Sequence, residues 1–177
     1  YEMQDGKIGY ILISGFEDVT LEQFEEALTN LTTQGMKGLV VDLRSNPGGN
    51  LSTVCEILDL ILGEGVMVSV KDGNGNKQEY KSDANCKLNV PLVVLINGYS
   101  ASASEIFAGA LQDNDRATIV GRRSYGKGLV QEPVYFSDKS GIRLTVARYY
   151  TPTGRCIQKP YGDDYGLDIV ERYRHGE

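Results

Sequence analysis

Two continuous apolar segments place the strongest constraint on the fold of this chain. One is GLVVDL, residues 38–43, and the other is VPLVVLIN, residues 90–97. Neither segment alternates apolar with polar residues, and such runs are typical of strands that are buried on both faces of a parallel sheet. Each is followed by a turn of small residues and then by apolar residues at helical spacing. Two such strand–turn–helix units predict an α/β layered fold with a largely parallel core sheet.

The remaining segments predict further strands and one more helix. An apolar β-rich run covers 7–16, and a helix follows from an expected N-cap at Thr20 to a glycine stop at Gly35. Residues 66–83 have the pattern of a hairpin with a Gly/Asn turn, and ATIVG after 116 predicts a short strand. Residues 129–154 indicate two β-runs joined by a Ser/Asp/Lys/Gly turn. We therefore expect additional β-hairpins around the core sheet.

Composition excludes several classes of protein. The 177 residues are 41% hydrophobic and 24% charged, which is typical of one well-packed domain. A net charge of -6 without any basic run argues against nucleic acid as a partner. No apolar stretch reaches the roughly 18 residues of a membrane-spanning helix, and no signal-peptide pattern is present. We expect an excised domain over 1–162 followed by a polar tail over 163–177.

The cysteines and the single histidine exclude several kinds of site. Cys55, Cys86 and Cys156 lie far apart and lack the C-x-x-C spacing of zinc sites. Cys55 is expected in the core, and a Cys86–Cys156 bridge is a lesser alternative. His175 lies near the end of the chain, which is a poor position for a catalytic triad or a metal ligand. We therefore expect no metal and no cofactor, and hydrolytic chemistry would need a base other than histidine.

Two loops of small residues follow the apolar strands. They are DLRSNPGGN, from residue 42, and NGYSASASE, from residue 97. Ligands of open α/β sheets gather at the carboxyl ends of the strands, so the loops are expected side by side. Gly48 and Gly49 leave backbone N–H groups accessible near a helix N-terminus, which favours a developing negative charge. The simpler interpretation of these glycines is a tight turn.

The second loop carries Ser100, Ser102 and Ser104, separated by alanines. Either the serines cap a helix, or one of them must be approached closely by another group. The stretch from Ser102 to Glu105 fits a capping box, in which serine and glutamate side chains satisfy each other's backbone N–H groups. On this pattern alone, capping is favoured over nucleophilic catalysis.

A lysine in the segment RRSYGKGLVQ changes that balance. Lys127 lies between Gly126 and Gly128, where the backbone can bend freely and leave the amine unshielded. Such a residue is usually a solvated turn residue. Without a usable histidine, however, Lys127 is the main remaining base, because a lysine buried against a serine can accept the hydroxyl proton. Gln131 could accept a hydrogen bond from the amine and orient it.

Four motifs in order are similar to those of the carboxyl-terminal processing (tail-specific) proteases, the S41 serine peptidases. They are DLRSNPGGN, NGYSASASEIFAGALQD, GRRSYGKGLVQ and YYTPTGRCIQKPYG, and the resemblance covers residues 7–162. It implies a ClpP/crotonase-like peptidase core with a Ser-Lys catalytic pair. In that resemblance Ser102 is the nucleophile, Lys127 is the general base and Gln131 orients the lysine. The implied oxyanion donors are the backbone N–H groups of Ala103 and Gly48.

Two assignments follow from the resemblance. Ser104 becomes the better candidate for the helix cap, because the resemblance makes Ser102 the nucleophile. Asp113 occupies a position that is often acidic in the family, but 11 residues of helix span roughly 16 Å. That distance is too long for a triad partner, so we expect Asp113 to be structural.

The resemblance also implies an activity and its setting. The expected reaction is cleavage near the C-termini of unstructured protein segments through an acyl-enzyme, with the peptide docked as an added β-strand. A PDZ domain, usual in the family, is absent from this chain and expected in the full-length protein, and an oligomer is possible. The implied location is the cell envelope or periplasm of a bacterium. The alternatives are a non-catalytic ligand- or peptide-binding module of the same fold and a hydrolase of other amides or esters.

Overall fold

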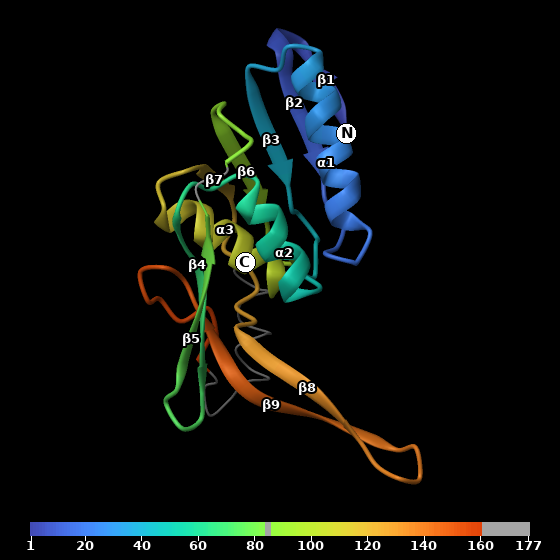
Figure 1. Cartoon of the computed structure of the whole chain (residues 1–177), viewed down its shortest axis with the longest axis vertical. Helices are drawn as coiled ribbons and strands as arrows, with labels where there is room; N and C mark the ends of the chain where they lie inside the picture. The colour runs from blue at the N-terminus through green and yellow to red at the C-terminus, as the bar shows by residue number, and fades with distance from the viewer. Residues whose placement is uncertain (84–85, 161–177) are drawn as a thin grey trace, which may run out of the picture.

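The computed structural model describes residues 1–83 and 86–160, and over that part of the chain it consists of two sheets, three α-helices and one short 3-10 helix (Figure 1). The predicted tail and His175 lie outside the described residues. In chain order the elements are β1 (Glu2–Gln4), the short 3-10 helix η1 (Asp5–Lys7), β2 (Ile8–Leu12), α1 (Thr20–Thr33), β3 (Gly38–Asp42), α2 (Leu51–Asp59), β4 (Gly65–Asp72), β5 (Lys77–Ser82), β6 (Leu92–Ile96), α3 (Ala103–Asp113), β7 (Thr118–Gly121), β8 (Leu129–Tyr135) and β9 (Gly141–Tyr150).

The larger sheet has the strand order β1-β2-β3-β6-β7, and every pairing except that of β1 with β2 is parallel. Both continuous apolar runs are therefore neighbouring strands in the middle of a parallel sheet, which confirms the predicted α/β core. Val41 of β3 pairs with Val94 of β6, and neither side chain is exposed to solvent. The burial of these strands explains why their sequences do not alternate.

The helices close a single core with the large sheet. Apolar residues of α1, α2 and α3 are buried together with those of β2, β3 and β6. Phe16, in the loop after β2, stacks in a tilted arrangement on Phe107 of α3 with ring centroids 6.0 Å apart. The Phe16 backbone also accepts from Asn50 N and donates to Gly48 O. This aromatic pair fixes the loop after β2 against the starts of α2 and α3.

The second sheet is antiparallel, with the strand order β5-β4-β9-β8. Both predicted hairpins are confirmed, as β4–β5 and β8–β9. The β8–β9 hairpin projects away from the body of the molecule as a two-stranded arm (Figure 1). Its base lies two residues after Lys127, so the arm begins at the turn that carries this lysine.

The cysteines are all free thiols. Cys55 lies in the core as predicted, and its burial raises the pKa of the thiol to about 12. Cys86 and Cys156 are exposed and unbridged, so the alternative of a disulfide between them is wrong.

Asp113, the last residue of α3, anchors a later turn of the chain. Its carboxylate accepts from the Thr153 backbone N–H at 3.0 Å and from the Thr153 hydroxyl at 2.6 Å, and it pairs with Arg155. Burial tends to raise the pKa of Asp113, but hydrogen bonds from Thr151, Thr153 and Arg155 outweigh it and lower this pKa to about 2. These contacts agree with the structural role that the sequence predicts.

The lowered pKa of Asp113 predicts a defined acid sensitivity. The stabilisation is fully present above the unfolded-state pKa of about 4 and is lost as the pH falls through about 2. We expect this carboxylate to contribute roughly 2 kcal/mol to the free energy of unfolding at neutral pH. Denaturant titrations of the wild type and Asp113→Asn between pH 2 and 7 measure it. A constant difference between the two proteins across that range would contradict the assignment.

Candidate functional site

The loops after β3 and β6 are bonded to each other directly. Ala101 N and the Ser104 hydroxyl each donate to the Asn46 carbonyl oxygen at 3.0 Å, and the Ser100 hydroxyl donates to the Leu43 carbonyl oxygen at 2.7 Å. Ser100 and Ser104 are fully buried. The prediction that the two loops lie side by side is confirmed, and the outer two serines bond the loops together.

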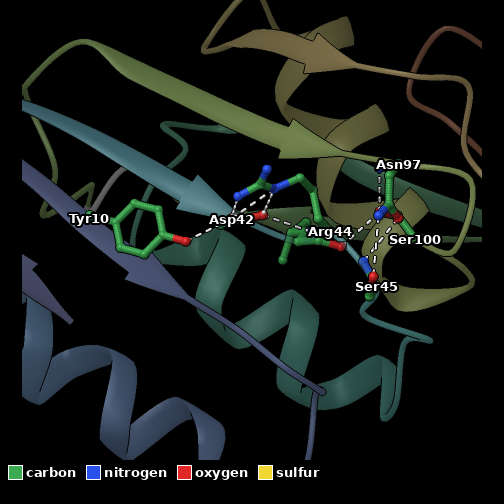
Figure 2. Close-up of polar contacts among 7 residues, drawn as sticks. Tyr10, Asp42, Arg44, Ser45, Asn97 and Ser100 are labelled. Atoms are coloured by element: carbon green, nitrogen blue, oxygen red, sulfur yellow. Dashed lines mark hydrogen bonds and ion pairs between the residues drawn. The ribbon is translucent and has the colours of Figure 1, made fainter.

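A second set of bonds joins the same loops nearer the surface. The side-chain amide of Asn97 accepts from Ser45 N at 2.9 Å and donates to the Ser45 hydroxyl at 3.2 Å. The Asn97 backbone N–H in turn donates to the Ser100 hydroxyl at 3.0 Å (Figure 2). The loop after β6 is therefore fixed from both sides before it reaches Ser102.

Ser102 differs from its two neighbours in exposure and backbone conformation. It is partly exposed and occupies the N-cap position of α3, with φ 56° and ψ -115°. A non-glycine residue in such a conformation is strained, and strain of this kind clusters at functional sites. The prediction of Ser104 as the cap is wrong, because Ser104 lies within the first turn of α3 and its hydroxyl is bonded to Asn46.

The Glu105 carboxylate links the Ser102 turn to the Lys127 turn. Glu105 is 6% exposed, and it accepts from the backbone N–H groups of Ser102 at 2.9 Å, Gly126 at 2.6 Å and Lys127 at 2.8 Å. The capping-box pattern predicts the bond to Ser102. It does not predict the bonds to Gly126 and Lys127, which lie 21 and 22 residues further along the chain.

Lys127 lies in the turn just before β8, and Gln131 lies within β8. Lys127 is half-buried in the turn before β8, and its ammonium forms no ion pair with any residue in 1–83 or 86–160. Gln131 is exposed on β8, where it pairs with Thr145 of β9. The structure brings the Lys127 backbone to the Ser102 turn through Glu105, whereas the role predicted for Gln131 stays a prediction.

Gly48 lies directly against Ser102 and Ala103. A methyl group in place of its hydrogen would lie 2.8 Å from Ser102 Cβ, 2.9 Å from Ala103 N and 2.7 Å from Ala101 O. Its φ of 105° also favours glycine. Unexpectedly, Gly48 N already donates to the Asn46 side-chain oxygen at 2.8 Å. Both predicted oxyanion donors therefore adjoin Ser102, but one of them is engaged by Asn46.

An ion pair between the exposed Arg44 and the buried Asp42 fixes the start of the loop after β3. Asp42 is 2% exposed and accepts from the Tyr10 hydroxyl at 2.7 Å and from Arg44 Nη2 at 2.6 Å (Figure 2). Burial tends to raise the pKa of Asp42, but the bonds from Arg44 and Tyr10 hold it below its usual range. The sequence analysis did not predict this cluster. The available signal was the pair of charged residues, Asp42 and Arg44, at the end of an apolar strand.

Comparisons with known proteins agree on one family. A profile described as Peptidase family S41 matches residues 7–166. The carboxyl-terminal-processing protease of Synechocystis sp. is 43% identical over 152 residues, which are 86% of this chain and 36% of that protein. The carboxy-terminal processing protease CtpB of Bacillus subtilis is 41% identical over 159 residues, which are 89% of this chain and 33% of that protein.

A solved structure extends the agreement to the fold. The photosystem II D1 C-terminal processing protease matches with a TM-score of 0.81 at 40% identity, over 88% of this chain and 42% of that one. The match bears out the ClpP/crotonase-like core implied by the motifs. The chain spans about a third of the length of the curated relatives it matches.

Gly48 provides a test of the close approach to Ser102. We expect Gly48→Ala to lower the free energy of unfolding by about 1–3 kcal/mol from backbone strain alone, with the close contacts to Ala101 and Ser102 adding to the loss. Gly63→Ala is the matched control, because a methyl group there would meet nothing within 4 Å. Thermal melts of both variants measure the difference. Equal melting temperatures would mean that Gly48 has room for a side chain.

Glu105 provides a test of the link between the two turns. Glu105→Gln replaces one acceptor oxygen with an NH2 group that faces backbone donors, so at least one of the three bonds is lost. We expect faster amide hydrogen exchange at Ser102, Gly126 and Lys127, with Glu132→Gln, on exposed β8, as the control. Bonds to a charged acceptor are worth about 1.5–3 kcal/mol. Unchanged exchange at Gly126 and Lys127 would show that Glu105 does not join the turns.

Proposed function

Because the chain belongs to peptidase family S41, we propose that it is the catalytic core of a serine endopeptidase with Ser102 as nucleophile and Lys127 as general base. One observation carries the proposal. A single buried carboxylate, that of Glu105, accepts the backbone N–H groups of both residues. The serine has a strained backbone, and the lysine forms no ion pair among the described residues, which supports the proposed roles.

In the proposed acylation step, the neutral amine of Lys127 removes the proton from the Ser102 hydroxyl as Oγ attacks the peptide carbonyl carbon. Negative charge then develops on the carbonyl oxygen, and backbone N–H groups beside Ser102 stabilise it. Ala103 supplies one donor. Gly48 supplies the other by exchanging its bond to Asn46 for one to the oxyanion.

Collapse of the tetrahedral intermediate breaks the C–N bond, and the Lys127 ammonium returns the proton to the leaving amine. A water molecule then attacks the acyl-enzyme ester while Lys127 accepts a proton from it. As the ester C–O bond breaks, the Lys127 ammonium returns that proton to Ser102 Oγ, and the product carboxylic acid leaves. Gln131 is proposed to orient the lysine amine.

The proposed substrates are unstructured C-terminal segments of proteins, docked as an added strand. Two of the relatives are named carboxyl-terminal-processing proteases, which supports C-terminal segments as substrates. The whole protein is proposed to include a PDZ domain and to be able to form an oligomer. The relatives include bacterial and chloroplastic proteins, and we propose the cell envelope or periplasm of a bacterium as the location of this one.

The proposal is tested by cleavage of an unstructured peptide and by labelling with a fluorophosphonate probe. We expect the wild type to label at Ser102 and to cleave the peptide. Ser102→Ala should abolish both, and it should lower the free energy of unfolding by no more than about 0.5–2 kcal/mol, because Ser102 is also the N-cap of α3. Lys127→Arg keeps the positive charge but offers no accessible neutral form, so its cleavage should be lost as well.

Ser104→Ala is the matched control, because it removes a neighbouring hydroxyl that donates to the loop carbonyl of Asn46. It should cost stability and retain labelling. Substantial cleavage by Lys127→Arg would remove Lys127 as the base. A wild type that neither labels nor cleaves would favour a binding module of the same fold, and cleavage of small esters but not of peptides would favour a different hydrolase.

A further inference from the structure

The segment from Thr151 to Lys159, with the sequence TPTGRCIQK, has no role in the chemistry described above. We call it the 151–159 segment. One end is bonded to the last residue of α3, because the Asp113 carboxylate holds Thr153 and Arg155. The middle follows the end of β9, where Ile157 N donates to Tyr149 O at 3.2 Å.

The other end of the 151–159 segment lies against the turn that carries Lys127. Gly128 N donates to the Gln158 side-chain oxygen at 3.0 Å, and Lys159 N donates to Gly126 O at 2.9 Å. The Gln158 amide is itself held, because its Nε2 donates to Lys159 O at 2.9 Å.

Close packing explains why glycines flank Lys127 on both sides. A methyl group on Gly128 would lie 2.3 Å from Gln158 N, and one on Gly126 would lie 2.7 Å from Lys159 Cβ. The expected use of glycine's backbone freedom also holds at Gly126, whose φ of 88° favours glycine. The two glycines allow the 151–159 segment to pack directly on the turn.

The turn is consequently held from two directions. Glu105 accepts the N–H groups of Gly126 and Lys127, and Gln158 accepts that of Gly128. Three successive backbone donors thus have side-chain acceptors from two different parts of the chain. Ser102, in contrast, is bonded to the Glu105 carboxylate and to the backbone of its own helix.

From these contacts we propose that the 151–159 segment positions Lys127, with Gln158 as the positioning residue and Asp113 as the anchor of the segment. The inference rests on the proposed function, in which Lys127 is the base. Loosening the segment should displace Lys127 while leaving Ser102 and the surrounding loops in place. Cleavage should then slow through kcat with little change in KM, because a small misplacement of a reacting group can cost up to roughly 100-fold.

The experiment compares Gln158→Met, Gln158→Glu and Asp113→Asn with the wild-type chain. Methionine keeps the length of the side chain but accepts no strong hydrogen bond, whereas glutamate keeps the acceptor for Gly128 N. Asp138→Asn is the matched control, because Asp138 also accepts a backbone N–H and a hydroxyl two residues later, but at the tip of the β8–β9 arm.

Two readouts separate this inference from the proposed function. The first is amide hydrogen exchange, which we expect to speed up at Gly126 and Lys127 as well as at Gly128 in Gln158→Met and Asp113→Asn. The second is the rate of peptide cleavage, which we expect to fall roughly tenfold or more in kcat in the same variants. Asp138→Asn should stay near the wild type in both readouts, whereas Gln158→Glu should keep slow exchange at Gly128, because its carboxylate still accepts from Gly128 N but adds a negative charge beside the Lys127 turn.

The outcomes that overturn the inference are distinct. If Gln158→Met speeds exchange at Gly128 alone, or if its kcat equals that of the active wild type, the segment does not position Lys127. If the wild type itself fails to cleave, the proposed function is wrong, and the exchange pattern still decides whether the segment holds the turn. Should Gln158→Met lose its fold, Asp113→Asn, which changes no residue in contact with the turn, decides in its place.

Discussion

The Glu105 carboxylate is the interaction on which the geometry of the candidate site depends. It lies in the first turn of α3, where the partial positive charge of the helix N-terminus favours an anion. A buried carboxylate would be costly without partners, and here three backbone N–H groups supply them. Because one side chain accepts N–H groups from both turns, the Ser102 turn and the Lys127 turn are held as a unit.

The parallel sheet determines which residues that carboxylate can reach. Because β3 and β6 are adjacent and parallel, their following loops emerge at the same edge, and Ser100 and Ser104 bond one loop to the other. Between these two fixed points the chain has to pass through Ser102, and it does so at a strained φ of 56°. Gly48 then fits against the serine only because it lacks a side chain. The strain at Ser102 is thus maintained by bonds on both of its sides.

Sequence patterns predicted the layers of the fold because they report burial. Unbroken apolar runs identified β3 and β6 as parallel strands, and the rule for carboxyl ends brought their loops together before any contact was known. The same patterns could not show that Glu105 bonds residues 22 positions away or that Asn46 occupies the Gly48 N–H. The cap was misassigned to Ser104 for a related reason. A residue takes the N-cap position through its backbone, and Ser102 does so at the start of α3.

The way Glu105 is bonded also bears on how a lysine can act as a base. An acidic side chain paired with the ammonium would stabilise the charged form, and a lysine in that state cannot accept a proton. Both oxygens of Glu105 are instead occupied by backbone N–H groups, one of them from Lys127 itself. The carboxylate therefore fixes the position of the lysine through its main chain, and no ion pair to the ammonium forms within residues 1–83 and 86–160. The lysine base that we propose needs a fixed position without a counter-ion, and bonding of the Lys127 backbone in place of its amine is consistent with both requirements.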